Sequence, residues 1–329
     1  LKGGEGVKKR EKKMSNRILI YDCSNLVIRF CSTMGSAGKS KIISAMLNNI
    51  RVEVNNRNVN FVVMAFDHGS SEFRKKLFPE YKAQRKAQRE KTPADVKATE
   101  LRYEIINEFI EVCRTIGLPV FYSYGIEADD LISFAATYSA DPVTIISTDK
   151  DFLQLVSERI TVYSPVKQIE YKPRTILKDL PYLKPSELKA YLVMTKVILG
   201  DKSDNLPNIP KIGEVKAAGL LERFFTKKLT DDDRKLFLEH KDLLQLNRQL
   251  VDLTQLPLDF QDKIFKELLK CLKIALEFSK NSEKIESISE KYTLNLNWVK
   301  AINSDLLTTI KRFISTLTYS KVVEGEEKQ

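Results

Sequence analysis

Short apolar runs recur along the first half of the chain. Four of them have the length and continuous hydrophobic character of strands that are buried on both faces of a sheet. They are "RILIYD" from Arg17, "VNFVVMAFD" from Val59, "LPVFYSYG" from Leu118 and "VTIISTD" from Val143. Three of the four run into an aspartate, so the pattern predicts acidic side chains where strands end.

Helical periodicity separates these runs. It predicts helices over residues 41–57, 93–116 and 128–138, the second with Thr92 as N-cap and Pro93 in its first turn. Strands that alternate with helices predict an α/β fold, with a parallel sheet wrapped by helices. Such sheets bind ligands beyond the carboxyl ends of their strands, which is the edge where the aspartates fall.

The character of the chain changes at about Pro173. The segment "ITVYSPVKQIEYKP" before it predicts a small hairpin, and the rest is nearly all helical. A helix predicted over 185–199 leads into a turn that is punctuated by Gly200, Pro207, Pro210 and Gly213. We expect a sheet domain over 17–172, a helical domain over 173–320, and tails over 1–16 and 321–329.

The composition narrows the classes of protein. The 329 residues are 43% hydrophobic and 30% charged, which is enough for a sizeable core. No apolar run reaches the ~20 residues of a membrane span, and the start lacks a signal-peptide pattern, so we expect a soluble, cytoplasmic protein. The two histidines argue against imidazole triads, and the cysteines lack zinc-site spacing. These residues are His68 and His240, and Cys23, Cys31, Cys113 and Cys271.

The net charge of +10 favours a polyanionic partner, with nucleic acid first. Residues 1–17 alone carry seven Lys or Arg against two Glu. The block "LKGGEGVKKREKK" precedes Met14. We interpret it as a disordered segment or an extension upstream of a natural start, with a nucleic-acid-binding tail as the alternative.

Nine acidic residues occupy predicted strand ends, a helix start or a turn. They are Asp22, Asp67, Glu127, Asp129, Asp130, Asp149, Asp151, Asp201 and Asp204. Singly, such residues are usually helix caps, turn residues or acids that favour a helix start. Together in a basic protein they would repel one another unless a divalent cation supplied compensating charge. Oxygen-only ligands predict Mg²⁺ or Mn²⁺ and not zinc.

One motif is misleading. "GSAGKS" at 35–40 imitates a phosphate-binding P-loop, but that pattern needs glycine at position 33, where Thr33 stands. We therefore expect a flexible loop ahead of the helix from Lys41, and no nucleotide hydrolysis.

Six motifs in order resemble the 5′-nuclease superfamily of flap endonucleases and 5′ to 3′ exonucleases. They are "LIYDCSN", "AFDH", "FPEYKAQR", "YGIEADDLIS", "IISTDKDFLQL" and "ILGDKSDNLPNIPKIGEVKA". The chain is most similar to the tailed-phage branch, including the RNase H of T-even phages. The resemblance covers about Arg17 to Leu256. It implies a PIN-like domain, a helical arch at about 70–92 and a helix-three-turn-helix at about 200–228 that grips duplex DNA.

The resemblance also implies two metal ions. Around the first it places Asp22, Asp67, Glu127, Asp129, Asp130 and Asp149, and around the second Asp149, Asp151, Asp201 and Asp204. Two such cations could activate a water and stabilise the leaving 3′ oxygen. A potassium ion at the helix-three-turn-helix is a further expectation from the family.

Basic residues complete the implied site. The segment Phe73–Lys91 matches the arch, where Tyr81 would stack on a base and Lys82 and Arg85 would reach the scissile phosphate. The alternative is a solvated, charged helix face. Arg29 and Lys196 match positions that contact phosphate. The turn with Lys211, Gly213 and Lys216 would bind duplex phosphates at a helix N-terminus, the alternative being an ordinary helix-turn-helix corner.

We therefore expect a monomeric, Mg²⁺-dependent, structure-specific 5′ nuclease acting on DNA flaps and on RNA annealed to DNA. Its work would be the removal of RNA primers and flaps during replication in a bacterial or phage-infected cell, with a single-strand-binding protein as a partner. An inactive DNA-junction binder and a PIN-type ribonuclease are alternatives. A binder, however, gains nothing from acids that repel DNA, and PIN domains lack the turn at 200–220. A dehalogenase-type phosphatase would need aspartate where Ser24 stands.

Overall fold

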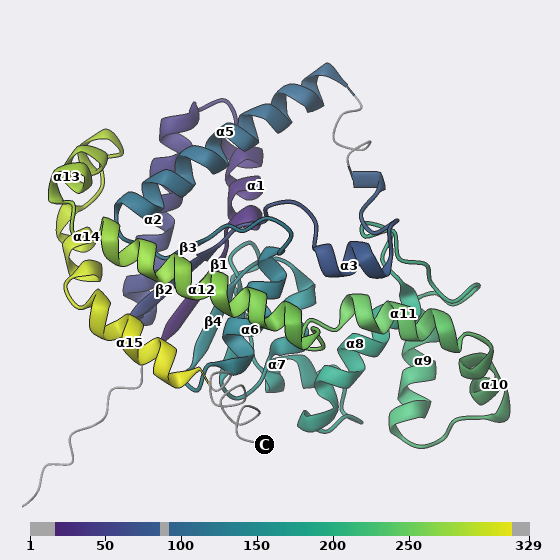
Figure 1. Cartoon of the computed structure of the whole chain (residues 1–329). Helices are drawn as coiled ribbons and strands as arrows, with labels where there is room; N and C mark the ends of the chain where they lie inside the picture. The colour runs from purple at the N-terminus through teal and green to yellow at the C-terminus, as the bar shows by residue number, and fades with distance from the viewer. Residues whose placement is uncertain (1–16, 86–91, 318–329) are drawn as a thin grey trace, which may run out of the picture.

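A six-stranded sheet forms the centre of the computed structural model, which describes residues 17–85 and 92–317 (Figure 1). Its order is β3-β2-β1-β4-β5-β6. All neighbouring strands pair in parallel except β5 and β6. The strands are β1 (Ile18–Asp22), β2 (Phe61–Ala65), β3 (Val120–Phe121), β4 (Val143–Ile146), β5 (Ile160–Ser164) and β6 (Ile169–Tyr171). The α/β fold and the four predicted strands are confirmed, and the predicted hairpin, β5–β6, extends the sheet.

Both faces of the sheet are covered, which explains why its strands are apolar without alternation. Along β1, Ile18 and Ile20 pack with α6, α12 and α15, while Leu19 and Tyr21 face α1, α2, α5, α13 and α14. The helices are α1 (Cys23–Met34), α2 (Lys39–Arg57), α5 (Pro93–Thr115), α6 (Ala128–Tyr138), α12 (Leu258–Phe278), α13 (Ser282–Lys291), α14 (Leu296–Asn303) and α15 (Leu306–Thr316).

The parallel register brings the strand ends to one edge. Tyr21 of β1 lies opposite both Met64 of β2 and Ile146 of β4, so these three strands finish level with one another. The acids that follow them in the sequence are therefore delivered to the same edge of the sheet.

Helix starts agree closely with the sequence signals. Thr92 and Asp95 form a reciprocal capping box at α5, as the Thr92–Pro93 pair predicts. Helix α2 begins at Lys39, two residues before the prediction, because Gly38 adopts the left-handed φ of 85° that turns the chain into it. The P-loop-like segment thus leads into a helix without a preceding strand.

A smaller helical unit projects from the sheet domain (Figure 1). Its helices α8, α9, α10 and α11 share an apolar core around Tyr191, Ile198 and Leu221. A turn over 200–213 joins α8 to α9, as the glycines and prolines predict. The elements from here are α7 (Pro173–Leu177), a 3₁₀ turn (Pro185–Glu187), α8 (Leu188–Leu199), α9 (Glu214–Phe225), α10 (Asp231–Glu239) and α11 (Lys241–Val251).

The last helices do not join this helical unit, contrary to the expected domain over 173–320. Phe260, Leu268 and Phe313 belong to one face of the central sheet, and Trp298 and Val299 to the other. Figure 1 shows α12 running across the sheet domain. Helical character alone cannot tell which core a helix covers, because an apolar stripe packs equally well on a sheet or on other helices.

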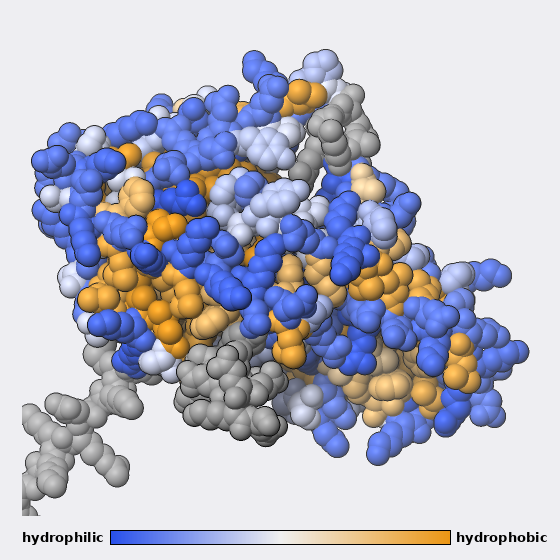
Figure 2. Space-filling model, in the orientation of Figure 1, coloured by the Kyte–Doolittle hydropathy of each residue, from blue (hydrophilic) through white to orange (hydrophobic). Residues whose placement is uncertain are grey.

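Most of the face in Figure 2 is hydrophilic. No helix among residues 17–85 and 92–317 is both long and apolar enough to cross a membrane. All four cysteines are free thiols, and three of them are buried. The predicted tails at 1–16 and 321–329 lie outside the described residues, as does part of the predicted arch.

Candidate active site

Four aspartates gather at the carboxyl edge of the sheet. Asp22 ends β1, Asp67 follows β2, Asp149 follows β4, and Asp129 lies in the first turn of α6. Their charges act on one another: the pKa of Asp22 is raised to about 7 by burial, and further by the carboxylates of Asp67 and Asp149. Burial and the same neighbours raise the pKa of Asp129 well above its ordinary range. Residues far apart in sequence thus form one acidic group.

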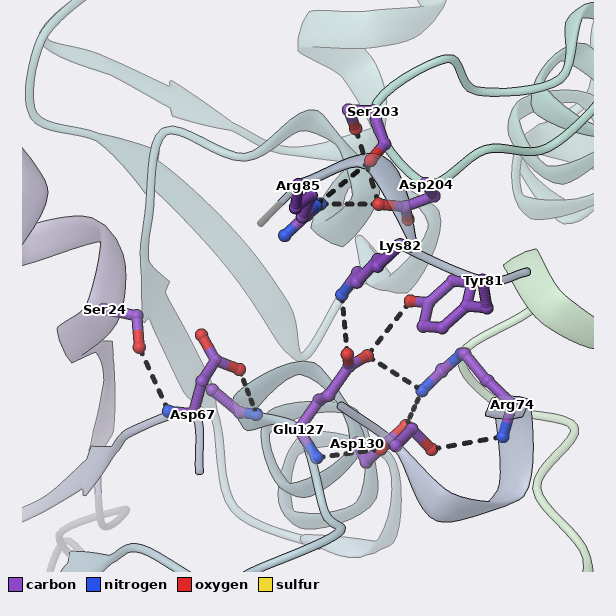
Figure 3. A network of polar contacts seen from close by, with 12 residues as sticks. Ser24, Asp67, Arg74, Tyr81, Lys82, Arg85, Glu127, Asp130, Ser203 and Asp204 are labelled. Carbon is purple, nitrogen blue, oxygen red and sulfur yellow. Dashed lines mark hydrogen bonds and ion pairs between the residues drawn. The ribbon is translucent and has the colours of Figure 1, made fainter. Parts of the chain in front are cut away.

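Each acid of this group except Asp129 also has a structural hydrogen bond. Asp22 caps α1 by accepting from the Asn25 amide at 3.0 Å and also accepts from the Ser147 hydroxyl at 2.7 Å. Asp67 accepts from the Ala128 amide at 2.9 Å (Figure 3). Asp149 accepts from the Asp151 amide at 2.8 Å. The same aspartates therefore cap turns or accept local hydrogen bonds and also belong to the acidic group, since a hydrogen-bonded carboxylate still acts on neighbouring charges.

Two further acids, Asp151 and Asp201, share one lysine. Lys196, near the end of α8, forms ion pairs with Asp151 and, at 2.9 Å, with Asp201. Burial tends to raise the pKa of Asp201, but Lys196 outweighs it and holds the pKa at about 2. The pKa of Asp151 is raised by burial and by Asp149, against the pull of Lys196. Asp151 therefore links the acidic group at the sheet edge to the turn that contains Asp201.

Glu127, Asp130 and Asp204 are paired with basic residues instead of with other acids (Figure 3). Asp130 is fully buried and accepts from Arg74 at 2.6 Å and from the Glu127 amide at 3.1 Å. Asp204 accepts from Arg85 at 2.5 Å. Both oxygens of Asp130 accept hydrogen bonds within the protein, and its role as an ion ligand stays a prediction.

Tyr81 also departs from expectation. Its side chain is 3% exposed, and its hydroxyl donates to the Glu127 carboxylate at 3.1 Å. It packs with Leu206, Leu250 and Val251. A ring buried in this way cannot stack on a base, so the aromatic residue that the arch pattern offered has a structural role here.

Lys82 and Arg85 do lie beside the acids. Lys82 donates to Glu127 at 2.7 Å, and burial of its ammonium is outweighed by Glu127, Asp204 and Asp129, which raise its pKa. Arg85 keeps about a third of its side chain exposed. In Figure 3 Lys82 points to Glu127, and Arg85 lies beside Asp204. They are the positive charges expected near a phosphate, held by the carboxylates around them.

Arg29 lies apart from the acids. Burial lowers the pKa of its guanidinium, which faces Tyr21, Glu53 and Tyr163. In the turn before α9, Gly213 is the N-cap, and a Cβ added there would meet no atom within 4 Å. Lys216 reaches back to the carbonyl of Lys211 at 3.4 Å. An open turn with two lysines at a helix N-terminus suits an anion.

No three acidic, histidine or cysteine side chains in the described part of the chain are close enough to hold one ion as they stand. Glu127, Asp204 and Asp201 each form an ion pair with a lysine or an arginine. The two implied metal sites therefore stay a prediction for every acid assigned to them.

Arg74 was missed by the sequence reasoning. Its guanidinium is 2% exposed and contacts both Glu127 and Asp130. It stands in the basic run "FRKK", where it looks like one more solvated charge. The available signal was the short helix that an N-cap at Ser71 begins, since such a helix must turn one side toward the core.

Comparisons with known proteins agree with this geometry. The family model "5'-3' exonuclease, N-terminal resolvase-like domain" matches residues 17–180. The 5'-3' exonuclease of Buchnera aphidicola is 30% identical over 219 residues, which cover 64% of this chain and 71% of that one. DNA polymerase I of Rhizobium leguminosarum is 33% identical over 60% of this chain, but this chain spans only 19% of it.

Solved structures share the fold. The 5′-exonuclease of bacteriophage T5 with bound zinc ions is 24% identical, with a TM-score of 0.67 over 79% of this chain and 100% of that one. The bacteriophage T5 flap endonuclease in complex with DNA and metal ions is 22% identical, with a TM-score of 0.63 over 84% of this chain and 100% of that one. By sequence, by fold and by the acidic group at the sheet edge, the chain belongs to the 5′-3′ exonuclease family.

Proposed function

We propose that the protein is a Mg²⁺-dependent, structure-specific 5′ nuclease that hydrolyses phosphodiester bonds near junctions of single strand and duplex. Its substrates are 5′ DNA flaps, free 5′ ends and RNA annealed to DNA. The observation that carries this proposal is the acidic group Asp22, Asp67, Asp129 and Asp149, whose mutual repulsion the fold retains. A protein that only bound DNA would gain nothing from this charge, because it repels phosphate.

The acids fit hard divalent cations in donor chemistry. All are carboxylates, and the raised pKa values of Asp22 and Asp129 come from burial and like charges that a cation would offset. We assign the acidic group to a first ion, and Asp149, Asp151, Asp201 and Asp204 to a second, with Mn²⁺ as a substitute. When bound, such ions generate the attacking hydroxide and neutralise the phosphate. Glu127 and Asp130 support the first site through Arg74 contacts.

Lys82 and Arg85 bring positive charge to the reacting phosphate. Glu127 holds the Lys82 ammonium and Asp204 holds the Arg85 guanidinium, so neither cation must be ordered when substrate arrives. Lys196 pairs with Asp151 and Asp201, and it would add positive charge for a phosphate that is bound beside them.

The helical unit grips the duplex. The start of α9, with Gly213, Lys211 and Lys216, offers amides, a helix dipole and two ammonium groups to a phosphate. The same turn would hold a potassium ion, which would add positive charge near the DNA backbone. Arg29 adds a weaker phosphate contact from α1.

A role in replication is supported by the relatives named DNA polymerase I, which match this chain over about half its length or more. We propose removal of RNA primers and flaps as a monomer in the cytoplasm of a bacterial or phage-infected cell. A single-strand-binding protein is the proposed protein partner.

The test is product mapping on one 5′-labelled flap, with Mg²⁺ and with chelator, beside a matched RNA–DNA hybrid. We expect cleavage at the junction that needs Mg²⁺, and cleavage of the RNA strand of the hybrid. Binding without cleavage in Mg²⁺ would reject the nuclease, while cleavage of the flap alone would remove only the RNase H activity.

A further inference from the structure

A buried arginine connects three elements beneath the basic side chains of the site. Arg74 comes from α3 (Glu72–Leu77) and donates to the Asp130 carboxylate at 2.6 Å and to Glu127 at 3.4 Å, both at the start of α6. It also donates to the carbonyl of Leu250, near the end of α11, at 3.0 Å. Figure 3 shows the guanidinium between α3 and the acids of α6.

This guanidinium remains charged. Burial tends to lower its pKa, but Asp130, Tyr81 and Glu127 outweigh burial and raise it. A buried cation is costly unless it is paired and hydrogen-bonded, and here two carboxylates and a carbonyl meet that need. The Nε of Arg74 donates to Leu250, while its Nη1 donates to both carboxylates. Lysine has one donor nitrogen, which cannot occupy both of these positions at once.

Glu127 extends this contact toward the proposed chemistry. Its carboxylate accepts from Arg74, from the Tyr81 hydroxyl at 3.1 Å and from Lys82 at 2.7 Å. The Lys82 amide in turn donates to the carbonyl of Asp204 at 3.0 Å. One carboxylate thus gathers the three basic or phenolic groups of the segment.

The backbone at Lys82 needs such support. Its φ is 57°, a left-handed conformation that is unfavourable for a residue with a side chain. It persists only where surrounding contacts over-determine it. The contacts that do so are the Glu127 carboxylate on the side chain and Asp204 on the amide.

We propose that Arg74 is a positioning residue of the nuclease: it fixes Glu127, and through Glu127 it holds the Lys82 ammonium where the reacting phosphate arrives. This inference rests on the proposed function. It adds a consequence for the helical unit, because Leu250 in α11 is the third acceptor of Arg74. The side chain of Arg74 therefore joins α3 to the start of α6 and to α11 of the helical unit.

The experiment compares Arg74→Lys with Arg57→Lys. Arg57 is the matched control because its guanidinium also pairs with two carboxylates, Glu53 at 2.8 Å and Glu170 at 2.9 Å, away from the site. Single-turnover cleavage of a 5′ flap at saturating enzyme, flap affinity and melting temperature are measured for both. The same three measurements are also made when Arg74→Lys or Arg57→Lys is combined with Lys82→Ala.

We expect Arg74→Lys to lower the single-turnover rate by about 10- to 100-fold, because a displaced ammonium no longer meets the phosphate. Flap affinity should change less than about threefold, and in the Lys82→Ala background the additional loss of rate should be less than about threefold, since the two residues act as one unit. An equal loss in both backgrounds, or a loss that Arg57→Lys reproduces, overturns the proposal.

A second readout does not depend on cleavage of DNA. Limited trypsin digestion, followed by mass spectrometry, reports how tightly the peptide bond after Lys82 is held. Arg74→Lys should accelerate cleavage there and Arg57→Lys should not. Unchanged digestion at Lys82 overturns the proposal even if the wild-type protein cuts no flap, whereas failure of the wild type alone to cut a flap rejects only the proposed function.

Discussion

Two charged clusters of this chain shift the pKa of a carboxylate in opposite directions. At the sheet edge, burial and neighbouring acids raise the pKa of Asp22 to about 7. Between α2, α5 and α13, Glu108 accepts hydrogen bonds from Tyr292, Lys291 and Lys39, which outweigh burial and hold its pKa at about 2. Both carboxylates are held by the fold, but only the second has its charge fully matched.

The difference separates a site from a structural ion cluster. Glu108 ties three helices together and leaves no charge for a ligand. Asp22 and its acidic neighbours keep a repulsion that protonation or a bound cation would relieve. A perturbed pKa therefore indicates function here when its cause is like charge and burial, and indicates structure when its cause is a full set of donors.

Asp149→Asn should have the largest effect of the substitutions proposed, and it tests whether the acidic group binds ions. If the acidic group holds ions, this change should abolish detectable Mg²⁺-dependent flap cleavage while flap affinity holds or rises, because one negative charge near the DNA is removed. Cleavage and affinity are measured on the same labelled flap. The exposed Asp231→Asn on α10 is the control and should cleave like the wild type. Wild-type turnover by Asp149→Asn would end the metal assignment.

Lys82→Ala tests whether the cations near the acids serve the reaction. The rate at saturating enzyme should fall by about 100-fold, because the substitution removes a fixed positive charge beside the developing negative charge. Melting temperature should change little, since Glu127 keeps Tyr81 and Arg74 as donors. Lys235→Ala, exposed on α10, is the control. A loss confined to flap affinity would make Lys82 a binding residue only.

The double variant Lys211→Ala, Lys216→Ala tests whether the turn before α9 binds the duplex without taking part in cleavage. For each lysine that binds a phosphate, its removal should reduce the slope of log affinity against log salt by about 1. The cleavage rate at saturating enzyme should be unchanged. Affinity is measured by titration at several salt concentrations, with Lys300→Ala as the control. An unchanged slope would place the duplex elsewhere.

Glu108→Gln probes the structural cluster and should have the smallest effect. Solvent screening limits the loss to about 1 kcal/mol of unfolding free energy, with cleavage unaffected. The folded pKa of about 2 lies below the ordinary 4.5, so the contribution is complete above 4.5 and is lost as the pH falls from there toward 2.

Urea unfolding of wild type and Glu108→Gln at several pH values checks this sign. The difference between the two proteins should shrink on acidification. Glu104→Gln, whose carboxylate is 63% exposed and pairs with Lys39 alone, should show almost no difference at any pH. A gap that widened in acid would contradict the assignment of the hydrogen bonds.

The central strands, the helices between them and the edge where the acids lie could all be predicted from the amino-acid sequence alone. Continuous apolar runs are typical of strands covered on both faces, and the aspartates after β1, β2 and β4 must share an edge once those strands are parallel. The cap at Thr92 and the turn from Gly200 to Gly213 were also readable, because capping and turn chemistry are local.

The ion pairs and the burial of individual side chains, in contrast, depend on the tertiary structure. It buried Tyr81 and Arg74 within a basic segment, paired Asp130 with Arg74, and placed α12 to α15 on the sheet and not on the helical unit. Local pattern cannot supply these outcomes, because ion pairs and core packing depend on residues brought together from distant parts of the chain. The partner of each charge is set by three-dimensional distance and burial, which a sequence period does not encode.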